Sequence, residues 1–251
     1  MRQGMVGRIA LALLVSCVLG GALYWGFLRN QDAEANGTRV ELDVSRLENG
    51  PAPSHFDTGQ SAVISQNPDD PGANLVVRDG KLTFDPTTDG VAAAYYSSPD
   101  MDGPITGLGA RWVFRPRTDD AAAISLVVSG GTRSEESDLV PPVPAQLVVT
   151  PINWNLSIKK DNASPLSPVA AGNFDTPLAV DGTTVYETSV SIDGSRVTIN
   201  LPDGEHRNVN DARIAQWQGH FAAFGLYSNN GLLDSVGGFE KIWATSVAGN
   251  K

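Results

Sequence analysis

The feature that most constrains the fold of this chain is a run of strict alternation near its middle. In residues 152–159, "INWNLSIK", apolar and polar side chains alternate from one residue to the next. A strand has a side-chain period of two and an α-helix a period of 3.6, so this run fits a strand with one buried and one wet face. A strand of this kind needs a second layer to cover its apolar side. The run therefore predicts a layered β protein.

A second run has the same period and also turns back on itself. Residues 184–201, "TVYETSVSIDGSRVTINL", place Val190 and Ile192 on one face, and Val197 and Ile199 resume the pattern after Asp193-Gly194. An Asp-Gly pair between two alternating runs is a strong hairpin signal. We expect two antiparallel strands here.

Weaker strand-like runs, separated by turn residues, fill the rest of the chain. Together with the two clear runs they give about a dozen strands, a number suited to a two-sheet antiparallel sandwich. Gly 26, Pro 16 and a charged fraction of 18% also favour short strands and turns. Only residues 211–217, "DARIAQW", read as a helix, with Asp211 as the N-cap. The weaker runs are 40–44, 62–65, 74–77, 81–84, 91–96, 108–114, 122–129 and 146–150.

Two irregular segments are longer than ordinary hairpin loops. They cover residues 130–146 and 161–182 and are rich in Pro, Ser, Gly and Asp. Connections of this length are often binding loops or disordered segments, and both interpretations stay open for this chain.

The N-terminus contains an uncharged apolar run at residues 9–28, "IALALLVSCVLGGALYWGFL". As a helix it would be roughly 30 Å long, the thickness of a bilayer core. Arg2 and Arg8 precede it, and the positive-inside rule then places residues 1–8 in the cytoplasm. We expect a single-pass signal anchor, a linker at 29–38 and an extracytoplasmic domain at 39–251.

Two alternatives to an uncleaved anchor remain. Ala33-Glu34-Ala35 is a small-x-small site that a signal peptidase could cut, which would give a secreted protein. Leu14-Val15-Ser16-Cys17 resembles a bacterial lipobox, although the residues after Cys17 stay apolar. All three fates export the domain. Cys17 is the only cysteine, so the exported part has no disulfide, and the excess of Arg over Lys is typical of a GC-rich bacterial genome.

The closing residues carry a family resemblance. Residues 225–228, "GLYS", and 239–243, "FEKIW", resemble the last strands of the concanavalin A-like lectin/glucanase superfamily, which includes laminin-G-like and 3-keto-disaccharide hydrolase-type domains. The hairpin at 184–201 resembles the one that precedes these strands in that group. The resemblance implies an all-β jelly-roll sandwich of two antiparallel sheets, but it does not imply a function.

The two closing runs also predict which side chains face the core. Phe224 and Leu226 should share one face of their strand, with Tyr227 on the other. Phe239 and Ile242 are three residues apart, so both can be buried only if their strand has a bulge or is covered on both faces.

Catalytic motifs are not evident. The β-glucanases of the superfamily use Glu-x-Asp-x-Glu, which places carboxylates on one wet face of a strand, and this sequence has no such run. The nearest acidic group, Glu135, Glu136 and Asp138, lies in a Pro-flanked segment and suits a solvated charge run. These observations favour a protein that is not an enzyme.

Cofactor and nucleic-acid sites are also not indicated. His55, His206 and His220 show no metal-ligand spacing. Asp69-Asp70 and Asp100-Met101-Asp102 could donate to calcium, which the superfamily sometimes binds, although Asp in such turns usually shapes the backbone. We expect no cofactor, with calcium as the alternative. A formal net charge of −10 argues against a nucleic-acid partner.

The remaining chemistry is that of a binding face. Outward amide, guanidinium and carboxylate groups beside aromatic rings suit sugar hydroxyls and ring faces, while the simpler interpretation is that they only face water. Trp112 and Trp154 are assigned to the core. The candidate ligand-binding residues are Tyr227, Asn153, Asn155, Arg111, Glu187 and Trp217.

From these residues we expect a non-catalytic glycan-binding module of the bacterial cell envelope, whose partner is a cell-surface glycan. Two alternatives stay open. One is a glycan hydrolase or lyase with an unrecognised site, and the other is a module that binds another envelope protein.

Overall fold

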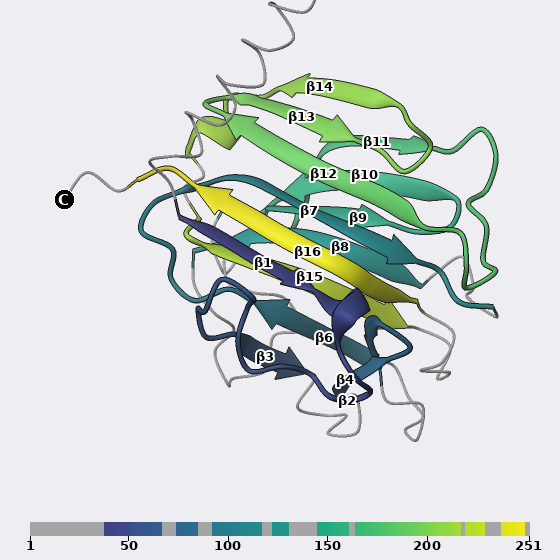
Figure 1. Ribbon diagram of the computed structural model, residues 1–251. Coiled ribbons are helices and arrows are strands. Elements are labelled where there is room, and N and C mark those ends of the chain that lie inside the picture. The colour runs from purple at the N-terminus through teal and green to yellow at the C-terminus, as the bar shows by residue number, and fades with distance from the viewer. Residues whose placement is uncertain are drawn as a thin grey trace, which may run out of the picture. The chain divides into compact units, whose positions relative to one another are not determined.

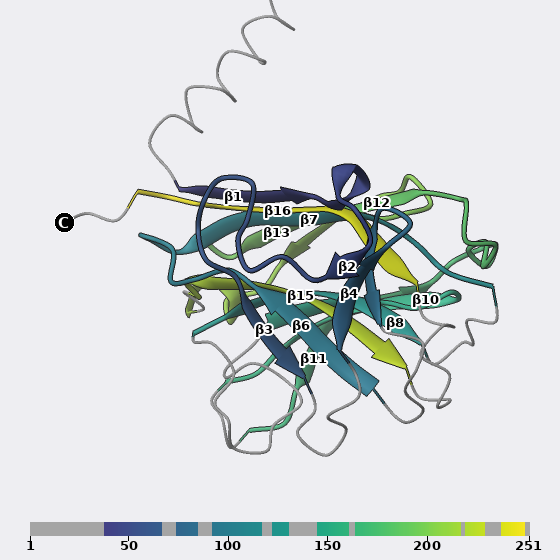
Figure 2. The ribbon, with the colours of Figure 1, turned by 60° about the horizontal axis from the view of Figure 1, so that its bottom comes forward.

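The alternating runs form two antiparallel sheets that pack face to face (Figures 1 and 2). The expected signal anchor, together with Asp69, Asp70 and Trp217, lies outside the described residues. In the part of the chain that is described, no helix is both long enough and apolar enough to cross a membrane. The computed structural model describes residues 38–66, 74–84, 92–116, 122–130, 145–160, 164–216, 219–228 and 237–248.

The front sheet, nearest the viewer in Figure 1, contains nine strands. The first strand, β1 (Arg39–Asp43), pairs with the last, β16 (Gly238–Ser246), in the middle of this sheet. The other members, from one edge to the other, are β14 (His206–Asn210), β13 (Arg196–Asn200), β12 (Tyr186–Asp193), β7 (Ile105–Val113), then β16, β5 (Lys81–Phe84), β4 (Leu75–Arg78) and β2 (Gly50–Pro51).

The back sheet contains seven strands and lies behind the front sheet. Its closing member β15 (Phe221–Ser228) sits between β8 and β6. The order across it is β11 (Ser167–Asn173), β10 (Asn153–Ile158), β9 (Ala145–Val149), β8 (Ala123–Ser129), β15, β6 (Ala92–Ser97) and β3 (Val63–Gln66).

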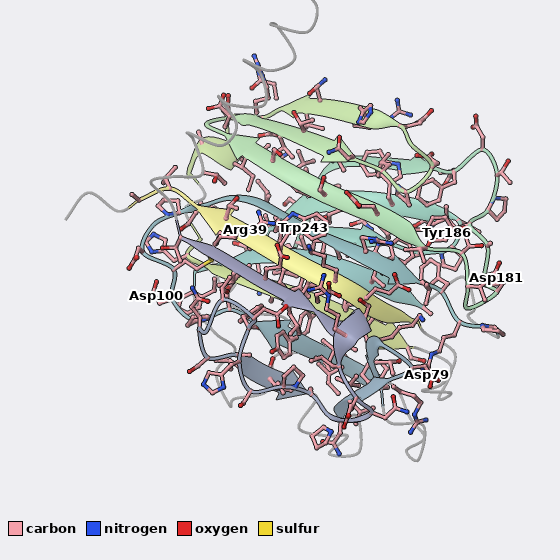
Figure 3. All side chains as sticks on the ribbon, viewed as in Figure 1. Arg39, Asp79, Asp100, Asp181, Tyr186 and Trp243 are labelled. Carbon is pink, nitrogen blue, oxygen red and sulfur yellow. The ribbon has the colours of Figure 1, made fainter. Side chains whose placement is uncertain are left out.

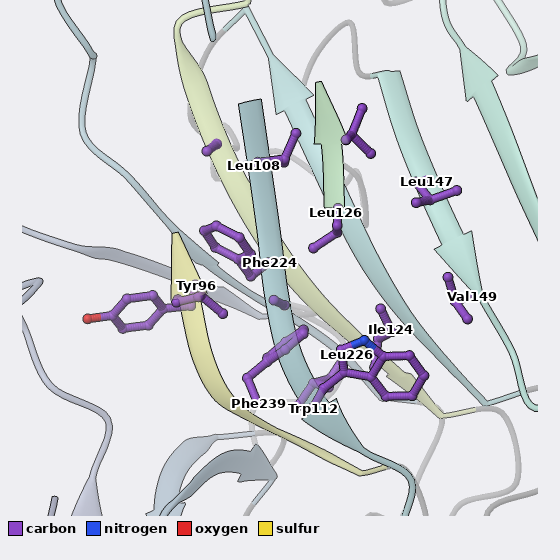
Figure 4. Packing of buried hydrophobic residues seen from close by; sticks show 14 of the residues in the cluster. Tyr96, Leu108, Trp112, Ile124, Leu126, Leu147, Val149, Phe224, Leu226 and Phe239 are labelled. Carbon is purple, nitrogen blue, oxygen red and sulfur yellow. The ribbon is translucent and has the colours of Figure 1, made fainter. Parts of the chain in front are cut away.

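One continuous apolar core fills the space between the sheets (Figure 4). Phe224 of β15 and Phe239 of β16 meet edge to face, with ring centroids 6.3 Å apart. Trp112 is fully buried, and its indole N–H donates to the Thr188 hydroxyl at 3.2 Å. Trp154 is also buried, so the assignment of both tryptophans to the core is confirmed.

The closing strands behave as expected. Phe224 and Leu226 are buried, while Tyr227 lies on the opposite face and is partly exposed. Phe239 and Ile242 are both fully buried, because the register of β16 against β7 shifts between Phe239 and Lys241. Because the bulge adds one residue, the positions of β16 that face the core shift by one, from Phe239 before it to Ile242 after it.

The expected helix at 211–217 is wrong for the part that is described. Asp211 accepts a hydrogen bond from the Arg213 backbone N–H at 2.9 Å, and only a 3-10 turn follows, at Ile214–Gln216. This short connection leads from β14 in the front sheet to β15 in the back sheet.

Besides the two-residue edge strand β2, two strands have no counterpart in the sequence analysis. Strand β11 forms inside the segment 161–182 that was expected to be irregular, and β14 follows the clear hairpin. Both are edge strands with mostly exposed or half-buried side chains, so they lack the apolar alternation by which strands are recognised.

Candidate functional site

The candidate residues from the sequence divide between the two outer surfaces of the sandwich. Arg111 of β7 and Glu187 of β12 are register partners on the outer face of the front sheet. Asn153 and Asn155 of β10 and Tyr227 of β15 lie on the outer face of the back sheet. The residues that were expected to act together therefore do not form one site.

On the back sheet, Tyr227 and the two asparagines are not neighbours. Strands β9 and β8 separate β10 from β15, which places Tyr227 roughly 14 Å from the asparagines across the sheet. Tyr95, Val127 and Ala223 form a small apolar cluster on this side and are all buried. Beside the partly exposed amides of Asn153 and Asn155, Gln146 and Val148 of β9 are half-buried.

The front sheet presents a continuous row of side chains on its outer face. In an antiparallel sheet, residues directly opposite each other share a face. The register makes this row His206, Asn200, Ser189, Gly109 and Trp243, one residue each from β14, β13, β12, β7 and β16.

A second row runs beside the first on the same face. It consists of Asn208, Thr198, Ser191, Gly107 and Thr245 from the same strands. With histidine neutral, none of the ten side chains carries a formal charge. We call these two rows, which cross five neighbouring strands, the uncharged lane.

Charged rows border the uncharged lane. On one side, Glu187, Arg111 and Lys241 follow one another in register, and on the other Asp193 faces Arg196. The Arg111 guanidinium lies 3.7 Å from the Glu240 carboxylate and forms an ion pair with it.

Trp243 lies over Gly109 of the neighbouring strand β7, at one end of the uncharged lane (Figure 3). A Cβ atom placed on Gly109 would be 2.4 Å from Cζ2 of the indole and 2.9 Å from Cβ of Ser189. The ring therefore covers the space that only a glycine leaves empty. Trp243 is half-buried, and its N–H donates to no group in the described part of the chain.

Hydrogen bonds hold the polar side chains of the uncharged lane in place. The Asn200 amide donates to Ser189 Oγ at 2.8 Å, and its oxygen lies 2.6 Å from His206 Nδ1. In the second row, the Thr198 hydroxyl donates to Asn208 Oδ1 at 2.9 Å. These groups are ordered before any ligand arrives, which reduces the entropy lost on binding.

Beyond Trp243, an ion-pair cluster closes the row. Glu41 is the register partner of Trp243, and its carboxylate lies 2.6 Å from both Arg39 Nη2 and Lys241 Nζ. Burial alone would raise the pKa of Glu41, but the hydrogen bonds from Lys241 and Arg39 outweigh it, so the pKa is lowered.

The described carboxyl groups with displaced pKa values all shift the same way. The pKa of Asp43 is lowered chiefly by the Ser45 hydroxyl, and that of Asp181 by the Thr184 backbone N–H. Hydrogen bonds from the Arg213 side chain lower the pKa of Asp211 to about 2. A general acid needs a raised pKa, so these groups suit hydrogen-bond acceptance and not proton donation.

Metal ligands do not cluster in the described ranges, where no group of three or more His, Cys, Asp or Glu side chains comes together. Asp102 accepts a hydrogen bond from the Thr38 hydroxyl at 2.9 Å, and Asp100 lies 3.5 Å from His220. The two aspartates therefore have other partners.

Trp243, the aromatic residue of this surface, was not among the candidate residues from the sequence. One signal could have revealed it. Ile242 and Ala244 are apolar neighbours that must face the core, so Trp243 between them must point outward. The matching glycine, Gly109, is identified only once the register of β16 against β7 is known.

No known family and no curated protein matches this sequence. Solved structures share its fold. The carbohydrate recognition domain of Emp47p matches with a TM-score of 0.53 at 12% identity, over 86% of this chain and 98% of that one. A LamA variant from Z. galactanivorans, solved with laminaritriose and laminaritetraose, matches with a TM-score of 0.53 at 11% identity, over 85% and 100%.

A third match comes from a phage protein. The CBM2 module of the evolved Dit of Lactobacillus casei BL23 phage J-1 gives a TM-score of 0.51 at 9% identity, over 86% of this chain and 98% of that one. At such identities the likeness shows the fold alone. The domain thus shares the two-sheet antiparallel sandwich fold of these carbohydrate-recognition and LamA structures, in agreement with the resemblance of its closing residues.

Proposed function

We propose that this chain is a non-catalytic glycan-binding module that uses the uncharged lane. The observation that carries the proposal is the half-buried Trp243, whose ring lies over Gly109 in the same row as Ser189, Asn200 and His206. An indole face packs against the C–H face of a sugar ring, and hydroxyl and amide groups exchange hydrogen bonds with its hydroxyls. The structural neighbours include a carbohydrate recognition domain and a LamA complex with oligosaccharides, which supports the same ligand class.

We also propose that the domain is extracytoplasmic and anchored to a cell membrane by residues 9–28. The motivation is the uncharged length of that run and the two arginines before it. The linker at 29–38, even if fully extended, spans at most about 35 Å. The glycan ligand would then belong to the cell envelope. If Ala35 is a cleavage site, the same module is secreted.

The binding proposal is tested with the fragment of residues 36–251, screened against envelope polysaccharides and a glycan array. Trp243→Ala should weaken binding at least about tenfold, or about 1.4 kcal/mol, because it removes the stacking surface. Asn155→Ala is the matched control, since Asn155 lies on the other sheet and should leave binding unchanged. The same titration with a chelator tests the calcium alternative.

Three results would contradict the proposal. Release of reducing ends from a bound polysaccharide would indicate the hydrolase or lyase alternative. Loss of binding in Asn155→Ala but not in Trp243→Ala would move the site to the back sheet. An envelope protein that co-purifies with the fragment, together with no response to any glycan, would indicate the protein-binding alternative.

A further inference from the structure

We infer that the uncharged lane binds an internal stretch of a linear, uncharged polysaccharide whose chain runs across the strands. The inference rests on the proposed function and specifies its ligand. It follows from the direction, the length and the charge of the lane. These depend on which residues of the five strands the register brings side by side.

The direction and the length come from the sheet. The uncharged lane crosses the five strands β14, β13, β12, β7 and β16, which are neighbours in that order. At about 4.8 Å between strands, its four intervals extend roughly 19 Å. A pyranose unit in an extended chain advances by a length close to one strand interval. The lane therefore accommodates about four successive sugar units.

The chemistry of the lane is also repetitive. Four of its five strands contribute side chains with a hydroxyl, amide, imidazole or indole group, and β7 contributes glycines, over one of which the indole lies. A repeating set of neutral donors and acceptors fits a repeating ligand better than it fits one sugar with a particular arrangement of hydroxyls. This favours recognition of a chain over recognition of a monosaccharide.

The charge pattern disfavours acidic chains. A uronate or sulfate placed over the lane would lose water without gaining a cationic partner among the ten lane side chains, and two of the basic groups that border the lane are already paired. Lys241 binds Glu41 at 2.6 Å, and Arg111 is directed to Glu240 at 3.7 Å. The negative charge of the chain as a whole, −10, acts in the same direction.

The lane is open at one end. Strand β14 is the edge of the front sheet, and its lane residues His206 and Asn208 are exposed. A polysaccharide longer than the lane can therefore continue past this edge. Binding should need neither the reducing nor the non-reducing end of the chain.

The test is a calorimetric titration of the 36–251 fragment with neutral laminari- and cello-oligosaccharides, from the disaccharide to the hexasaccharide. We expect affinity to rise at least about tenfold from disaccharide to tetrasaccharide and then to level off, because a fifth sugar adds few contacts. Chemical reduction of the end sugar should change nothing for the longer oligosaccharides. A polyuronate should not compete.

Variants at the far end of the lane localise the effect. Asn200→Ala and His206→Ala should lower the affinity for the tetrasaccharide and leave that for the disaccharide nearly unchanged, because the disaccharide binds at Trp243. Equal affinity for short and long oligosaccharides, or tighter binding of the polyuronate, would overturn the inference while leaving glycan binding in place. No binding of any oligosaccharide would overturn the inference and count against the proposed function as well.

Discussion

At the scale of single residues, the pair Gly109 and Trp243 supports both the fold and the proposed site. The glycine lowers the stability of a central strand, since it has no side chain to pack against its neighbours. The indole from β16 fills this space. The same arrangement recurs on the back sheet, where Tyr95 lies over Gly225 and a Cβ atom there would be 2.5 Å from the ring. Cross-strand aromatic cover of a glycine stabilises sheets without any ligand.

This arrangement makes Gly109→Ala an informative variant. The added methyl group would overlap the indole, so we expect Trp243 to leave its position, with a loss of stability of about 1–3 kcal/mol and of glycan binding. Urea denaturation and tryptophan fluorescence measure the two effects. Gly107→Ala is the control, because there the nearest atom is the Thr245 hydroxyl at 3.0 Å, on a side chain that can rotate.

The double variant Gly109→Ala with Trp243→Ala separates overlap from other causes. If overlap with the indole is the reason for the instability, the added methyl group should cost much less stability once the indole is gone. An unchanged cost of the methyl group in the two backgrounds would show that the overlap with Ser189 Cβ or the backbone, and not Trp243, requires Gly109.

At the scale of elements, the attachment of β1 to β16 includes the ion pair between Glu41 and Lys241. The folded-state pKa of Glu41 is lowered, so its contribution to stability is present above the unfolded pKa of about 4.3 and is lost as the pH falls through the folded value. Glu41→Gln should therefore be less stable than wild type at pH 7, by under about 1 kcal/mol. The difference should shrink in acid.

Denaturation at a series of pH values measures this difference. Glu187→Gln is the matched control, because among the described residues Glu187 makes no ion pair although it lies on the same face. A difference for Glu41→Gln that persisted at low pH would mean that the carboxylate charge is not the cause.

The elements also show how far the sequence could predict the structure. The alternation of apolar and polar residues predicted β10, β12 and β13, because the buried and exposed faces of these strands differ strongly. Edge strands β11 and β14 were not predicted, because their side chains are mostly exposed or half-buried and do not alternate between apolar and polar. To predict the site, the register between strands must also be known. Arg111 and Glu187 were correctly expected to point outward, but the sequence of one strand does not show which residues of the neighbouring strand lie beside it.

At the scale of the whole molecule, the charge of the chain and the neutrality of the lane predict how binding depends on salt. Between about 0.05 and 0.5 M salt the Debye length falls from roughly 14 to 4 Å, which weakens long-range attraction between exposed charges. Binding of a neutral polysaccharide should stay constant over this range. Calorimetry at both salt concentrations, with Trp243→Ala as the non-binding reference, measures it. A steep loss of affinity with salt would indicate a charged ligand.

The position of β1 has a mechanical consequence. Any tension carried by the chain before Thr38 enters the domain at Arg39, and β1 passes it to β16 through five residue pairs, from Arg39 with Thr245 to Asp43 with Lys241. A pull along the strand axis loads all five pairs together in shear, whereas a pull at right angles opens them one after another from Arg39. The domain should therefore resist tension along β1 far better than tension across it. Because β16 also carries Trp243, tension between the N-terminal segment and a bound ligand would pass through this one pair of strands.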